Sequence, residues 1–84
     1  MILQVITELI VKVLECDIDK VNENSMLIED LMVDSLSIAK IAVEIEDYFD
    51  VMFDEDFFYP FEDISVGAFC EKVEAFLEGQ ASNE

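Results

Sequence analysis

Apolar residues recur every three or four positions in three stretches of the chain, which is the period of an amphipathic helix. The first stretch runs from residue 2 to about 15, the second from 35 to about 49, and the third from 66 to 78. No stretch shows the alternation of apolar and polar residues that is typical of a half-buried strand. The pattern therefore predicts an all-α domain.

Residues with capping chemistry stand at the predicted helix boundaries. Asp34 precedes the second helix and Ser65 precedes the third, and both side chains can accept hydrogen bonds from the N–H groups of a helix start. Gly79 is a common kind of residue just past a helix end, so we expect the third helix to stop before it. The predicted domain then covers residues 1–79, and residues 80–84 form a polar tail.

The two connections between the helices differ in character. Residues 17–33 combine Asp, Asn and Ser with isolated apolar residues and show no sustained period, which predicts a long loop held onto the core. Loops of this length in a small domain are more often functional than idle. Residues 50–64 join an acidic run at 54–56 to an aromatic run at 57–61, and we expect a short helical turn there. The expected architecture is a small helical bundle.

The second predicted helix carries apolar residues on two separate faces. At about 100° per residue, one face, which we expect in the core, contains Ile38, Ile41, Ala42, Ile45 and Phe49. A second face, centred about 130° away on the same helical wheel, contains Leu36, Ala39 and Val43. It is framed by Lys40, Glu44 and Asp47 on one side and Glu46 on the other. Either the rest of the domain buries both faces, or the second face binds a partner, which is the interpretation that we favour.

The composition fits one small domain with an acidic surface. The chain has 84 residues, 54% of them hydrophobic, a formal net charge of −17 and no His. An acidic disordered tail would be poor in apolar residues, so this composition favours a packed core. The charge disfavours nucleic acid and anionic membranes as partners and favours basic proteins. Without His the chain lacks the usual neutral-pH base and the commonest neutral metal ligand, so we expect neither catalysis nor a metal site.

Cysteine spacing and the N-terminal stretch indicate the compartment. Cys16 and Cys70 are far apart and form no C-x-x-C pair, so we expect two reduced thiols rather than a disulfide framework or a zinc site. Residues 2–14 are too polar to span a membrane and lack the basic start of a signal peptide. We expect a cytoplasmic protein, and a monomer.

Ser35 stands beside Asp34 at the start of the second predicted helix. A hydroxyl there lies close to unpaired backbone N–H groups and to the positive end of the helix dipole, where an attached phosphate would be stabilised. No His or Lys is adjacent in sequence, so attaching a group to this hydroxyl requires an external enzyme. Taken alone, the Asp34-Ser35 pair indicates only a helix N-cap.

Four short motifs change that interpretation because they occur together, in a specific order and spacing. They are I-E-D-L at residues 28–31, D-S-L at 34–36, I-E-D-Y-F-D at 45–50 and S-V-G at 65–67. The chain thereby resembles the acyl carrier protein family, including the related peptidyl carrier domains. The fold of that family is a four-helix bundle with a long first loop and a short third helix, which agrees with the organisation predicted above.

The resemblance implies that Ser35 receives 4′-phosphopantetheine from coenzyme A through a phosphopantetheinyl transferase. The terminal thiol of the arm then carries an acyl or aminoacyl group as a thioester, while the protein supplies position and recognition. Asp34 is implied to contribute to the transferase contact. Partner enzymes are implied to bind the second face of the helix, and we expect the partner surface to comprise Leu36, Ala39, Lys40, Val43, Glu44 and Asp47.

Three departures from the family pattern point to a specialised role. Met32 stands where the family usually has Gly, Lys40 where fatty-acid carriers often have an acidic residue, and M-F-D-E at 52–55 replaces the usual I-P-D-E. We expect a free-standing carrier of a specialised polyketide or nonribosomal peptide pathway. An adenylating enzyme or an acyltransferase would load it, and downstream synthase or tailoring enzymes would use it. Whether the cargo is acyl or aminoacyl stays open.

Three other functions compete with this interpretation. A general carrier of fatty-acid synthesis would share the motifs. An acidic binding or decoy protein without a cofactor would share the net charge, but it would not need D-S-L at a helix start. An EF-hand beginning at Asp50 fails, because Glu55 stands at the required Gly and Phe61 at the last Glu.

Overall fold

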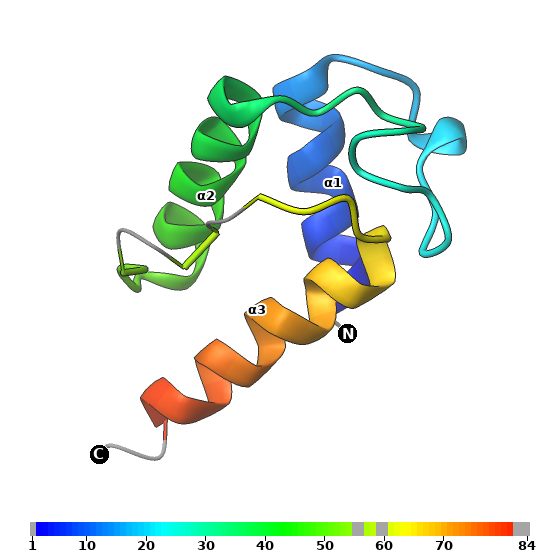
Figure 1. Ribbon diagram of the computed structural model, residues 1–84. Helices are drawn as coiled ribbons and strands as arrows, with labels where there is room; N and C mark the ends of the chain where they lie inside the picture. Colours follow the sequence, from blue (N-terminus) through cyan, green and yellow to red (C-terminus); the bar gives the residue numbers. More distant parts are fainter. Residues whose placement is uncertain (1, 55–56, 59–60, 82–84) are drawn as a thin grey trace.

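Each amphipathic stretch forms an α-helix in the computed structural model, which describes residues 2–54, 57–58 and 61–81. The helices are α1 (Ile2–Leu14), α2 (Ser35–Phe49) and α3 (Val66–Ala81), and a short 3-10 helix, η1 (Ile18–Lys20), follows α1. Helix α1 packs against both α2 and α3, and α3 crosses below the other two in the view of Figure 1. The described residues contain no strand, and the expected all-α fold is confirmed.

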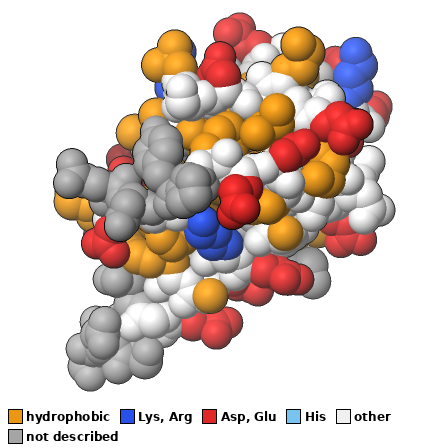
Figure 2. Space-filling model, in the orientation of Figure 1, with side chains coloured by type: hydrophobic (Ala, Val, Ile, Leu, Met, Phe, Trp, Pro, Cys, Tyr) orange, Lys and Arg blue, Asp and Glu red, His pale blue; other side chains and the backbone are white. Residues whose placement is uncertain are grey.

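The surface of the molecule is acidic over wide areas. Figure 2 shows carboxylate side chains scattered among apolar ones on the visible face. Within the described residues one ion pair forms, between Lys12 Nζ and Glu44 Oε1 at 2.7 Å. In the same part of the chain, no helix combines the length and the apolar character needed to cross a bilayer. The fold therefore depends on its apolar interior rather than on charge pairing.

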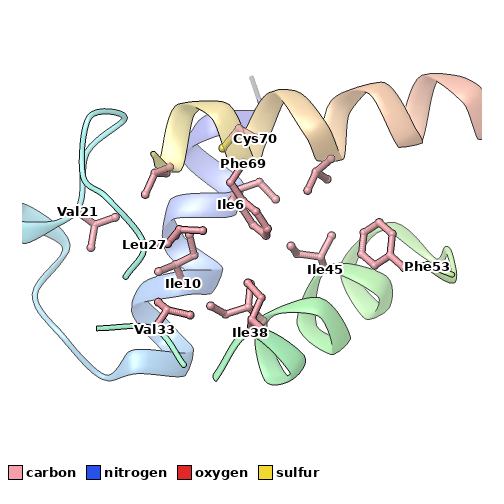
Figure 3. Packing of buried hydrophobic residues seen from close by; sticks show 13 residues of the cluster. Ile6, Ile10, Val21, Leu27, Val33, Ile38, Ile45, Phe53, Phe69 and Cys70 are labelled. Atoms are coloured by element: carbon pink, nitrogen blue, oxygen red, sulfur yellow. The ribbon is translucent and has the colours of Figure 1, made fainter. Parts of the chain in front are cut away.

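The core is built from all three helices and from the long loop. Figure 3 shows its side chains converging between the elements. The members that are most completely buried are Ile6 and Ile10 of α1, Ile38, Ile41 and Ile45 of α2, Val66, Phe69 and Val73 of α3, and Leu27 of the loop. Full burial of one such side chain contributes about 1.5–3 kcal/mol. The predicted core face of α2 is confirmed, with Ala42 and Phe49 partly buried beside the isoleucines.

The long loop completes the start of α3. The first N–H groups of a helix have no acceptor within the helix, and here the loop supplies carbonyl oxygens to two of them. Val66 N–H donates to Ser25 O at 2.8 Å and Gly67 N–H donates to Glu23 O at 2.9 Å. A Cβ atom on Gly67 would lie 3.1 Å from Glu23 O, so a side chain there would disturb this approach. The loop is therefore held onto the core, as the sequence predicted.

The segment between α2 and α3 packs through aromatic rings. The hydrogen bond from Phe57 N–H to Asp54 O, at 3.0 Å, closes one turn, but no helix forms in the described residues of 50–64. The expected short third helix is thus not confirmed. Residues 55–56 and 59–60, which belong to the acidic and aromatic runs, lie outside the described residues. Ring contacts join Phe53, Phe57, Phe58, Phe69 and Phe76.

The helix boundaries test the capping predictions. Asp34 Oδ1 accepts a hydrogen bond from Ser37 N–H at 2.8 Å, and Ser65 Oγ accepts one from Ala68 N–H at 3.1 Å, so both predicted caps are confirmed. The predicted stop at Gly79 is wrong, because α3 continues to Ala81. Gly79 does not adopt a left-handed conformation, and a helical glycine costs only about 1 kcal/mol. The expected boundary at residue 79 therefore falls inside a helix.

Met32 adopts a left-handed backbone conformation, with φ of 56°. This is the position at which the carrier family usually has Gly. The turn before α2 is therefore formed with a side chain that disfavours it by about 1–2 kcal/mol. Because the side chain of Met32 is 82% exposed, its packing does not offset this strain.

We expect Met32→Gly to raise the free energy of unfolding by about 0.5–1 kcal/mol, because relief of the strain exceeds the extra flexibility of glycine in the unfolded chain. Urea unfolding followed by circular dichroism measures the change. Met52→Gly is the matched control, since Met52 is 81% exposed and has no positive φ, and it should lower stability slightly. An equal loss in both variants would contradict the strain at Met32.

Candidate functional site

Ser35 is the first residue of α2 and its side chain is exposed. The loop reaches it through Val33, which is buried and whose N–H donates to Leu27 O at 2.8 Å. Asp34 then caps the helix. The backbone at Ser35 is therefore fixed on both sides, by the buried side chain of Val33 before it and by the capped helix after it. The side chain of Ser35 is exposed to solvent. Figure 1 places this point at the end of α2 that receives the long loop.

The charge next to Ser35 is fixed by the cap. The hydrogen bond from Ser37 N–H lowers the pKa of Asp34 below its usual value, so the carboxyl is ionised at neutral pH. In the described part of the chain no side chain is hydrogen-bonded to Ser35 Oγ. The hydroxyl therefore has no internal base, and its modification depends on a base from another protein.

The second face of α2 is open to solvent. Leu36 is 67% exposed, Val43 is 59% exposed, and Ala39 is also exposed. We call these three residues the exposed stripe. The alternative in which the domain buries both apolar faces is therefore wrong. Adjacent apolar side chains that remain exposed along a helix are typical of a surface that another protein covers.

Part of the exposed stripe lines a depression between α2 and α1. The depression has a volume of about 390 Å³ and is lined by Lys12, Val13, Ala39, Lys40, Val43 and Glu44. The structure thus brings together four of the expected partner residues. Leu36 lies nearer to Ser35 along the same stripe, outside the depression. Lys12 and Val13 were not expected in the site, because an analysis of α2 by itself gives no information about which residues of α1 lie beside it.

Of the two lysines that line the depression, Lys12 is paired with a carboxylate and Lys40 is not. The hydrogen bond and ion pair with Glu44 raise the pKa of Lys12, and the negative charge of Asp47 adds to this effect. Lys40 is exposed and forms no ion pair with any described residue. Lys40 is therefore available to a partner, whereas Lys12 is already neutralised.

Cys70 does not provide an alternative nucleophile. Cys16 and Cys70 are free and Cys70 is buried. Burial raises the pKa of Cys70 to about 11, so this thiol is protonated at neutral pH and unreactive. Cys70 therefore does not compete with the hydroxyl of Ser35.

Comparison with known proteins gives one family. A family model described as a phosphopantetheine attachment site matches residues 4–73. The match spans α1, the long loop, α2 and the first part of α3, and it includes the D-S-L motif at the start of α2. No curated protein matches the chain.

Two aspartate substitutions on α2 test the exposed stripe. We expect Val43→Asp to change the free energy of unfolding by less than about 0.5 kcal/mol, because the new charge stays in water. We expect Ile45→Asp to lower it by more than about 3 kcal/mol, because Ile45 is fully buried and the carboxylate would have no partner. Urea unfolding measures both values, and equal losses would assign Val43 to the core.

Proposed function

The chain belongs to the phosphopantetheine attachment family of acyl and peptidyl carrier proteins, and from this membership we propose that Ser35 carries the cofactor. The family is defined by covalent attachment of 4′-phosphopantetheine, and the protein is a carrier of that arm. Carriers of this kind work with a phosphopantetheinyl transferase and with partner enzymes. The observation that supports Ser35 is an exposed hydroxyl at the start of α2, directly after the capping Asp34 and inside the matched span.

The other serines fit the role less well. Ser25 is buried, and its Oγ is engaged in hydrogen bonds within the long loop. Ser65 Oγ caps α3, and Ser37 is partly buried in the first turn of α2. Ser82 lies outside the described residues. Among the described serines, Ser35 combines an exposed side chain with a hydroxyl that forms no hydrogen bond to a described residue.

The contribution of this chain to the modification is positional. The transferase supplies the base that removes the proton from Ser35 Oγ, since the chain has none nearby. The positive end of the α2 dipole stabilises the phosphodiester that links the arm to the protein. The arm supplies the thiol on which an acyl or aminoacyl group is carried as a thioester. The protein itself then acts as a substrate of its partners rather than as an enzyme.

We further propose that the exposed stripe and its charged neighbours are the docking surface for those partners. Exposure of Leu36, Ala39 and Val43 supports this proposal. The unpaired Lys40 supports a dedicated pathway of polyketide or nonribosomal peptide type, because a partner that selects this carrier needs a charge pattern that general carriers lack. General fatty-acid synthesis is the second candidate.

We also propose that the protein is a monomer in the cytoplasm. Two free cysteines support the cytoplasm, where thiols stay reduced. The net charge of −17 supports a monomer, because two copies repel each other.

We expect incubation with coenzyme A and a broad-specificity phosphopantetheinyl transferase to add the mass of one arm to the wild-type chain and none to Ser35→Ala. Ser35→Ala should fold normally, since Asp34 provides the cap. Ser37→Ala is the matched control, two positions along the same helix, and it should be modified like the wild type. Intact-mass measurement reads all three, and an arm on Ser35→Ala would show that another residue is the site.

We expect Lys40→Glu to lower kcat/KM for loading by the dedicated adenylating enzyme or acyltransferase about tenfold, because a favourable contact becomes a repulsive one. Modification of Ser35 should continue. Lys20→Glu on η1 makes the same charge change on a different element and should have little effect on loading. The dedicated role would be contradicted if a fatty-acid synthase loaded and elongated the wild-type protein as readily as its own carrier.

A further inference from the structure

The turn that precedes Ser35 is held by a carboxylate from a distant part of the chain. Asp63, in the segment before α3, accepts a hydrogen bond from Ile28 N–H at 2.8 Å with Oδ1 and one from Glu29 N–H at 3.3 Å with Oδ2. The partners are separated by 35 and 34 positions in sequence. The next N–H groups of the loop bond to carbonyls of the loop itself: Asp30 and Leu31 to Met26 O, Met32 to Ile28 O and Val33 to Leu27 O. Ile28 and Glu29 therefore depend on Asp63.

One feature of the loop opposes this conformation. Met32 is in the left-handed region, at φ of 56°, where a residue with a Cβ atom is strained. Two carboxylates hold the turn against this strain. Asp30 Oδ2 accepts a hydrogen bond from Met26 N–H at 2.8 Å within the loop, and Asp63 accepts its two bonds from outside the loop. Hydrogen bonds from backbone N–H groups to an ionised carboxylate are stronger than neutral ones.

The contact is connected to Ser35 by a short chain of bonds. Ile28 O accepts a hydrogen bond from Met32 N–H at 3.0 Å, and Met32 is followed within three residues by Ser35. Ile28 and Met32 are also exposed, at 38% and 82%, and Met32 lies three residues before Ser35. The turn is thus accessible to a protein that binds around Ser35.

We propose that Asp63 is a positioning residue for the modification of Ser35, an inference that rests on the proposed function above. Its carboxylate keeps residues 28–32 in one conformation, so that the transferase meets a preformed turn and does not have to order it on binding. Loss of this contact lowers the fraction of molecules that are ready to bind. The apparent affinity falls by that fraction, while the rate of the bound complex is unchanged.

The test uses steady-state kinetics of arm transfer to the full chain, with coenzyme A and a broad-specificity phosphopantetheinyl transferase. Asp63→Asn places an amide NH₂ group opposite one of the two backbone N–H groups and so removes one acceptor. Glu62→Gln is the control, because it removes the same charge from the adjacent exposed residue, whose side chain forms no hydrogen bond to the described residues. We expect the KM for the carrier to be about threefold to fivefold higher for Asp63→Asn than for Glu62→Gln, with equal kcat.

A second substitution separates positioning from a general loss of stability. Met32→Gly relieves the strain in the turn, so the turn then depends less on Asp63. The comparison is between the double variant, Met32→Gly with Asp63→Asn, and the single variant Met32→Gly. We expect the KM of the double variant to be within about 1.5-fold of the KM of the single variant. A role of Asp63 elsewhere in the fold would leave this ratio unchanged.

The possible results are distinct. Equal KM values for Asp63→Asn and Glu62→Gln, a lower kcat at unchanged KM, or a ratio that Met32→Gly does not reduce would each overturn the positioning role. Failure of the wild-type chain to accept the arm would instead overturn the proposed function, before any variant is compared.

Discussion

The position of Ser35 depends on the backbone hydrogen bonds between the long loop and the start of α3. These hydrogen bonds have two effects. They give acceptors to the N–H groups of Val66 and Gly67, which a helix start leaves unpaired, and they fix a loop that has no regular structure of its own. The buried side chains of Leu27 and Val33 then carry the loop across the core to α2. Ser35 is thereby exposed to solvent while the backbone on both sides of it is fixed.

The excess of acidic residues limits how many ion pairs can stabilise the fold. With 21 acidic residues and 4 basic ones, most carboxylates have no cation to pair with. Several carboxylates accept hydrogen bonds from backbone N–H groups instead. Asp34 caps α2, and Glu46 Oε2 accepts a hydrogen bond from Phe53 N–H at 2.7 Å. Bonds from N–H groups to ionised acceptors are stronger than neutral ones.

Local signals in the sequence predicted the features that depend on neighbours in the chain. The period of apolar residues predicted three helices and both faces of α2, and the chemistry of Asp34 and Ser65 predicted the caps. The features that it could not predict depend on tertiary contacts. Gly79 stays inside α3, and the ring of Phe57, in the segment after α2, stacks on the ring of Phe53. The pairing of Lys12 with Glu44 and of Asp63 with the long loop joins residues more than thirty positions apart, which no local pattern encodes.

Amide hydrogen exchange of the unmodified protein tests most directly the claim that the long loop is a fixed part of the domain. The informative groups are the N–H groups of Leu27, Val66 and Gly67, which bond across the contact between the loop and the start of α3. Our account predicts that they exchange nearly as slowly as the N–H groups of Ile41 and Ile45 in the middle of α2, because opening the contact requires the core to open. Exchange of these three groups at the rate of an unfolded chain, while α2 stays protected, would contradict it.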